Sequence, residues 1–166
     1  WLNSYADASK FDGFVLGVSG GIDSAVTATL CLMTGKPVYV IDLPIHQDPT
    51  ELERSRELCD SFSKRFSNIT VLRVPLTDVY EATKAALPDS VDLSQGLALA
   101  NTRARLRMTF LYAIGAQRRA LVVGTGNKIE DFGIGFFTKY GDGGVDVSPI
   151  ADLLKSEVYA LGRVLG

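Results

Sequence analysis

The feature that most constrains the fold is the alternation of short apolar runs, rich in β-branched residues, with longer segments of helical period. Buried strands are expected at 14–18, 38–43, 69–74 and 120–123, and helices at about 22–33, 50–66, 76–87, 93–117 and 152–165. Parallel strands need crossover connections that cover the sheet. We therefore predict an α/β fold, a Rossmann-like parallel sheet with helices on both faces, and look for ligands at the carboxyl ends of its strands.

Composition restricts both the size and the partners of the chain. Its 166 residues are about one domain's worth, and 46% of them are hydrophobic, enough for a sizeable core. Seventeen basic and 19 acidic residues give a net charge of −2, which favours neither a nucleic-acid nor a membrane partner. Cys31 and Cys59 lack metal-ligand spacing and indicate a reducing, cytoplasmic compartment. Because the chain begins at Trp1 and stops in a predicted helix, we expect residues 1–166 to be one domain truncated at both ends.

A candidate phosphate loop joins the first strand to the first long helix. Two adjacent glycines allow close backbone approach to a ligand, and the helix amides and dipole favour an anion. Asp23 would repel phosphate unless a cation lies between them, so its presence implies Mg²⁺. The plainer alternative is a tight turn with Asp23 facing the helix dipole. The candidate ATP-binding residues here are Gly17, Val18, Ser19, Gly20, Gly21, Ile22, Asp23 and Ser24.

This loop, Ser-Gly-Gly-x-Asp-Ser at 19–24, resembles the signature of the ATP pyrophosphatases. That superfamily includes NAD synthetase, GMP synthetase and asparagine synthetase, and its loop grips the departing pyrophosphate. The loop lacks the Gly-Lys-Ser/Thr of a P-loop. By itself it does not select one member of the superfamily.

Later segments select the member. Residues 101–108 read Asn-Thr-Arg-Ala-Arg-Leu-Arg-Met, 124–130 read Gly-Thr-Gly-Asn-Lys-Ile-Glu, and 138–144 read Thr-Lys-Tyr-Gly-Asp-Gly-Gly. In this order, over most of the chain, they resemble the ammonia-dependent NAD synthetase family. Gly143-Gly144 also suggests positive φ angles close to a ligand, although an ordinary glycine-rich turn is the simpler alternative.

Three arginines share the helix predicted at 93–117. At about 100° per residue, Arg103 and Arg107 lie within about 40° of each other, beside an apolar stripe. Arg105 points some 160° from Arg103 by the same arithmetic, so one ligand cannot meet all three. The family resemblance assigns Arg105 to the dinucleotide substrate, which leaves Arg103 and Arg107 as structural or interfacial ion partners.

The resemblance implies further site residues. Asp23 and Glu130 match the magnesium ligands, although the longer spacing from Glu130 to Lys139 leaves Asp131 as an alternative. Thr125 and Lys155 match ATP contacts, and an exposed helix lysine is the simpler reading of Lys155.

Three side chains in the glycine-rich stretch between Gly124 and Ser148 complete the candidate site. Lys139 offers a charge for phosphate or carboxylate, and Asp146 can accept from a ribose hydroxyl. Asp142 either positions ammonia or caps its own turn. The predicted catalytic set is therefore Asp23, Lys155 and Asp142, and the predicted substrate-binding set is Arg105, Lys139 and Asp146.

The resemblance also implies a reaction. Deamido-NAD, ATP and ammonia would be the substrates, Mg²⁺ the cofactor and a homodimer the assembly, with NAD, AMP and pyrophosphate as products. Another ATP pyrophosphatase, such as GMP synthetase, is the alternative enzyme. A nucleotide-binding module without catalysis is the alternative from a different class.

Overall fold

The computed structural model describes residues 1–91 and 97–166. Within them, four strands form one parallel sheet in the order β3-β2-β1-β4. The strands are β1 (Gly13–Val18), β2 (Val38–Asp42), β3 (Ile69–Arg73) and β4 (Ala120–Val122). The predicted parallel α/β fold is confirmed. The strands β2, β3 and β4 each end one residue earlier than expected, and β1 begins one residue earlier, at Gly13.

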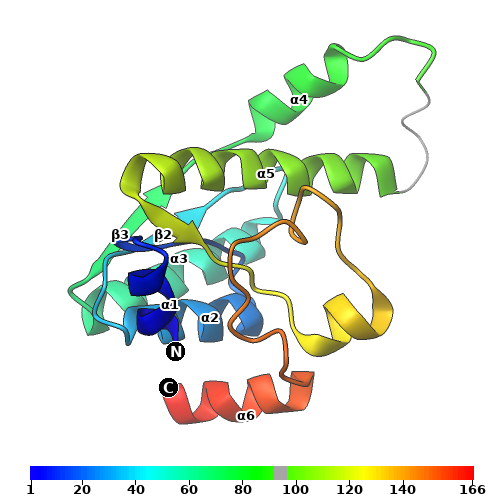
Figure 1. Cartoon of the computed structure of the whole chain (residues 1–166). Helices are drawn as coiled ribbons and strands as arrows, with labels where there is room; N and C mark the ends of the chain where they lie inside the picture. Colours follow the sequence, from blue (N-terminus) through cyan, green and yellow to red (C-terminus); the bar gives the residue numbers. More distant parts are fainter. Residues whose placement is uncertain (92–96) are drawn as a thin grey trace.

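Helices cover both faces of this sheet (Figure 1). One face carries α4 and α5, and the opposite face carries α1, α2 and α3, with α6 beyond α2. The bounds are α1 (Leu2–Ala8), α2 (Ile22–Leu32), α3 (Pro49–Arg65), α4 (Thr77–Ala85), α5 (Leu97–Arg118), the π-helical turn η1 (Ile129–Ile134) and α6 (Lys155–Leu165).

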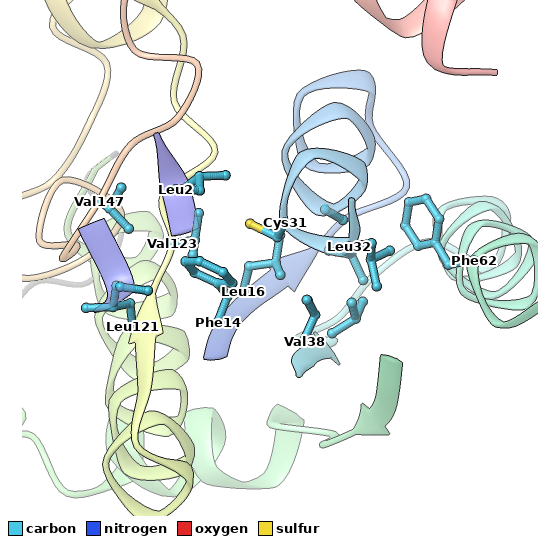
Figure 2. Close-up of a cluster of buried hydrophobic side chains, with 14 of the residues drawn as sticks. Leu2, Phe14, Leu16, Cys31, Leu32, Val38, Phe62, Leu121, Val123 and Val147 are labelled. Carbon is cyan, nitrogen blue, oxygen red and sulfur yellow. The ribbon is translucent and has the colours of Figure 1, made fainter. Parts of the chain in front are cut away.

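Strand alternation divides the core between the two faces, because successive side chains of a strand point in opposite directions. Phe14 and Leu16 of β1 pack with Cys31 of α2 and Phe62 of α3, in the cluster drawn in Figure 2. Val15, between them, packs with Leu111 of α5 on the other face. Apolar burial of this kind contributes about 25 cal/mol per Å², so it is what fixes the helices on the sheet.

The topology places a crevice at one edge of the sheet. From β1 the chain passes through α2 to β2 on one side, and it later returns to β4 on the other side of β1. The connections that follow β1 and lead to β4 therefore run to opposite sides of β1. The carboxyl ends of these two strands mark the switch point, where α/β sheets bind ligands.

Local signals predicted element ends less well. The helix expected at 50–66 begins one residue earlier, at Pro49, and Asp48 is its N-cap, with the Asp48 carboxylate accepting from the Thr50 N–H. The expected helix at 152–165 begins only at Lys155. Of the helix expected at 93–117, positions 93–96 lie outside the described residues, and α5 ends at Arg118.

Two short helices escaped sequence analysis. In α1 only Leu2 and Ala6 face the core, which is too few apolar residues to show a period. In η1 the structure buries none of the residues, so no apolar stripe marks it, and glycines at 133 and 135 suggested a loop.

Candidate functional site

A cavity of about 340 Å³ opens at the carboxyl ends of β1, β2 and β4. Its volume is in the range of small-molecule sites. Its walls combine the phosphate loop, the segment after β4 and the inner face of α5. Among the lining residues are Gly17, Val18, Ser19, Ser24, Thr125, Glu130, Asp131, Asp142 and Arg107.

The phosphate loop has the geometry that its glycines predict. Gly20 has a φ of +77°, and a Cβ there would lie 2.9 Å from the Ser55 backbone nitrogen of α3, so this position needs glycine. Ser24 Oγ donates to the Gly21 carbonyl at 2.9 Å and accepts from the Ser19 N–H at 3.4 Å. These bonds hold the loop closed at the start of α2, where helix amides attract an anion.

Two carboxylates from distant parts of the chain converge on one cation. Lys155 Nζ, at the start of α6, donates to Asp23 Oδ2 in α2 and to Glu130 Oε1 in η1, the latter at 3.1 Å. Burial opposes the charge on Lys155, but the hydrogen bonds to the two carboxylates raise its pKa overall. The structure therefore brings together three residues that sequence analysis named, over 132 positions of the chain.

Asn127 links the Asp23 carboxylate to the backbone of η1. Its side chain is completely buried, and its Nδ2 donates to Asp23 Oδ1 at 3.0 Å. Its Oδ1 accepts from the backbone N–H groups of Ile129 and Glu130, at 3.1 and 3.2 Å. Sequence analysis gave Asn127 no role, because no pattern shows that an asparagine after β4 will be buried against α2.

Asp131 and Asp142 are further acidic residues that line the cavity. Asp131 packs against Gly126, where a Cβ would lie 2.0 Å from its Oδ2, so this glycine makes room for the carboxylate. Desolvation, with the negative charges of Asp142 and Glu130, raises the pKa of Asp131. No cluster of three or more His, Cys, Asp or Glu side chains in ranges 1–91 and 97–166 forms a metal site.

The metal-ligand alternatives differ in their placement. Glu130 shares the Lys155 ammonium with Asp23, whereas Asp131 lies against Gly126. Two carboxylates that already converge on a cation fit Mg²⁺, which accepts one or two carboxylates alongside phosphate oxygens. This geometry favours Glu130 as the second ligand.

The residues predicted to bind the dinucleotide hold their own loop. Arg105 donates to the Lys139 carbonyl at 3.1 Å and to Thr138 Oγ1 at 3.2 Å. Asp146 accepts from Tyr112 Oη at 3.1 Å and from the Val122 N–H at 2.8 Å. Their binding roles stay predictions, and the structure adds that both side chains anchor the segment between η1 and α6.

Lys139 and Asp142 lie in the same segment. Lys139 is exposed, with its Nζ 5.0 Å from the ring centre of Tyr140. Asp142 accepts the Thr138 N–H at 2.8 Å, the turn-capping contact considered above, and it also lines the cavity. Asp142 is exposed, and a role for it in positioning ammonia stays a prediction.

The expected positive φ angles at Gly143 and Gly144 are wrong, since neither residue adopts one. Tyr140 does instead, with a φ of +65°. Position 143 has no room for a side chain, because a Cβ there would lie 2.4 Å from the Phe137 ring.

Arg107 is one of the polar cavity residues that sequence analysis left outside the site. Its Nε donates to the Leu43 carbonyl at 3.0 Å, and its Nη2 to Gln47 Oε1 at 3.3 Å. Burial, and then the charge of Arg103, lower its pKa. The available signal was its place beside the apolar stripe, facing the end of β2.

Comparison with known proteins identifies the family. The family model described as NAD synthase matches residues 1–166. The chain belongs to the NAD synthase family. Family membership confirms the resemblance that the motifs predicted, and it favours NAD synthetase over the other ATP pyrophosphatases.

Individual relatives in the NAD synthase family agree with this assignment. The NH(3)-dependent NAD(+) synthetase of Mesoplasma florum is 41% identical over 155 residues, which cover 93% of this chain and 61% of that protein. The Carboxydothermus hydrogenoformans enzyme of the same name is 39% identical, with 100% and 67% covered. The chain thus spans about three fifths to two thirds of these relatives.

Solved structures of NAD synthase relatives share the fold. An NMN synthetase from Francisella tularensis superposes with a TM-score of 0.90 at 37% identity, covering 99% of this chain and 66% of that one. An NH3-dependent NAD synthetase from Campylobacter jejuni gives 0.85 at 34% identity, covering 99% and 68%. Among the described residues, no helix has the length and hydropathy to cross a membrane.

Proposed function

We propose that the protein amidates deamido-NAD with ammonia, using ATP and releasing AMP and pyrophosphate. The observation that carries the proposal is the convergence of Asp23, Glu130 and Lys155 at the phosphate loop, beside a cavity at the switch point that Ser19, Ser24 and Glu130 line. Family membership supplies the substrate class, because the relatives above are named for NAD synthesis.

The reaction has two steps. The nicotinate carboxylate attacks the α-phosphorus of ATP, the bond to the β-phosphate oxygen breaks, and pyrophosphate leaves an acyl-adenylate. Ammonia then attacks the acyl carbon, AMP leaves with the bonding electron pair, and the new amide loses a proton. No side-chain nucleophile is needed, so the chain's task is to screen the meeting of two anions and to position them.

Each polar group near the phosphate loop has a place in this scheme. The loop amides at Ser19 to Ser24 would hold the departing pyrophosphate, and Lys155 and Thr125 would contact the triphosphate. Asp23 and Glu130 would hold Mg²⁺, which when bound neutralises phosphate charge. Asp142, at the opposite wall, would position ammonia.

We further propose a homodimer in the cytoplasm. The apolar stripe of α5 supports the dimer: Met108 and Leu111 are buried in the core, whereas Leu97, at the other end of the helix, is 66% exposed. Figure 1 shows this end of α5 and α4 extending past the sheet. Two unpaired cysteines, Cys31 and Cys59, support a reducing compartment.

The test is whether AMP forms from ATP only when an acid substrate is present. Purified protein, Mg²⁺ and ammonium would be assayed with deamido-NAD, with nicotinate mononucleotide, and with neither. We expect AMP, pyrophosphate and NAD in equal amounts with deamido-NAD. The mononucleotide arm is included because of the structural match to an NMN synthetase. Bound ATP without AMP in every arm would indicate a binding module and overturn the proposal.

A further inference from the structure

We infer that Asn127 is a positioning residue for the cation site: its buried amide holds Asp23 and Glu130 so that their carboxylates face one cation. The inference rests on the proposed function, in which these two carboxylates hold Mg²⁺. The Asn127 side chain bonds to Asp23 and to the backbone of Ile129 and Glu130, and Asn127 is not itself among the residues that line the cavity.

The hydrogen bonds fix the orientation of the Asn127 amide. Its oxygen faces two backbone N–H groups, at Ile129 and Glu130, and only a carbonyl oxygen can accept from both. The amide nitrogen must therefore face Asp23, where it donates to Oδ1 at 3.0 Å. With no exposed surface on Asn127, water does not compete for these bonds, so losing one leaves a buried group unsatisfied.

This arrangement leaves one oxygen of Asp23 for the cation. Oδ1 is occupied by Asn127, and Oδ2 meets Lys155 Nζ, which also contacts Glu130 Oε1. Asn127 also caps the first turn of η1, which carries Glu130. One amide thus sets the direction of the first carboxylate and the helical turn that presents the second.

The segment that leads into α6 is also bonded to this part of the chain. The Lys128 N–H, next in sequence, donates to the Leu153 carbonyl at 3.0 Å, two residues before Lys155. The backbone at 127–128 therefore links α2, η1 and the start of α6. Removing a residue that orients the ligands of a metal typically lowers the metal affinity by about 10–100-fold.

The test separates the cap from the contact with Asp23. Asn127→Ser keeps a short acceptor for the amides two and three residues on, but its hydroxyl is too short to reach Asp23. Asn127→Ala removes both functions. The probe is α,β-methylene-ATP, whose α–β bridge cannot be cleaved, titrated by calorimetry with Mn²⁺ and again with EDTA. The measured quantity is the factor by which Mn²⁺ strengthens nucleotide binding.

We expect Asn127→Ser to remain folded, with a urea midpoint somewhat below the parent's, and to lose about tenfold or more of the Mn²⁺ enhancement under conditions where it is fully folded. The loss should vanish when Asp23 is already alanine, since a positioning effect needs the residue that is positioned. Asn68→Ser is the matched control, because Asn68 donates only to the Leu32 and Lys36 carbonyls, far along the chain from the site.

Two outcomes would overturn the inference. One is a parent-like Mn²⁺ enhancement in Asn127→Ser and, for whatever fraction folds, in Asn127→Ala. The other is a loss of the same size in the Asp23→Ala background. Neither measurement uses deamido-NAD, so failure of the proposed reaction and failure of this inference are told apart.

Discussion

The two sides of the cavity are built in different ways. At the phosphate loop, a network of hydrogen bonds surrounds the completely buried amide of Asn127. The other members of the network are Asp23, Glu130 and Lys155. The other side is the segment that follows Glu130, residues 132–146, which exposes large apolar side chains to solvent, among them Phe132, Ile134, Phe136 and Tyr140, each more than 70% exposed. Its polar residues bond mainly to the segment itself and to α5.

The contrast indicates which half of the site is preorganised. Charges that are already oriented cost little to reorganise when a triphosphate arrives, and this is where electrostatic catalysis gains most. In the other half, Arg105 and Asp142 hydrogen-bond to the backbone of the loop and so fix its path. Any contact that they make with a ligand is additional to these bonds. Substitutions should therefore act on chemistry at the phosphate loop and on substrate affinity across the cavity.

The largest effect is expected from Asp23→Ala. Removing this carboxylate deletes one of two proposed metal ligands and leaves the Asn127 amide without its acceptor. We expect AMP formation to fall by more than about 100-fold, with the fold retained by circular dichroism. Asp12→Ala is the control, since Asp12 pairs with Arg119 on the surface with 63% of its side chain exposed. Activity of Asp23→Ala within about tenfold of the parent would remove the metal-ligand role.

The next largest effect should come from Arg105→Ala. A charge-assisted contact contributes about 1.5–3 kcal/mol, so the KM for deamido-NAD should rise by roughly 10–150-fold while the KM for ATP stays close to the parent's. Arg103→Ala is the comparison, because the Arg103 guanidinium lies 5.4 Å from the ring centre of Tyr80 on α4. Steady-state kinetics with each substrate varied in turn gives both values. Equal effects of the two changes would mean that α5 does not separate their roles.

Sequence reasoning predicted the sheet well because apolar runs and helical periods are patterns among neighbouring residues. Val15 and Val40 are buried within the continuous apolar runs that identified their strands. The phosphate loop was equally accessible, since its glycines and serines adjoin one another in the chain.

What escaped prediction depends on contacts between distant segments. Asn127 and Asp23 are 104 positions apart, and nothing near Asn127 reports that α2 will lie against it. Arg107 was judged by its place on a helix, whereas its role is set by the Leu43 carbonyl and Gln47, at least 60 positions away. The η1 turn exposes its apolar residues, so burial patterns carry no trace of it.

A smaller effect is expected from Asp142→Asn. An asparagine oxygen can still accept the Thr138 N–H, so the thermal midpoint should stay within about 2 °C of the parent's. If the carboxylate positions ammonia, the KM for ammonium should rise several-fold without a change in the KM for ATP. Asp142→Ala, which also loses the cap, should lower the midpoint further. Unchanged ammonium kinetics in Asp142→Asn would leave this residue with the capping role alone.

The smallest effect should come from Tyr112→Phe, which tests how firmly Asp146 is held. Tyr112 Oη donates to Asp146 Oδ1 at 3.1 Å, while Oδ2 accepts from the Val122 N–H of β4. Because Tyr112 is 39% exposed, this bond should contribute less than about 1 kcal/mol to the free energy of unfolding. Tyr5→Phe is the control, as Tyr5 has the same exposure on α1.

The pH dependence gives the sharper form of that test. Burial, and then the charge of Asp146 and the bond to it, raise the pKa of Tyr112 from 10.0 to about 12. An acid whose folded pKa is raised stabilises the fold below its unfolded pKa, and this stabilisation is lost as the pH rises from 10 towards 12. Urea unfolding at pH 8 and 10.5 should therefore show a steeper loss in the parent than in Tyr112→Phe. Identical slopes would mean that the fold does not oppose ionisation of Tyr112, which argues against a close contact with the Asp146 carboxylate and leaves the Val122 N–H as the bond that holds Asp146.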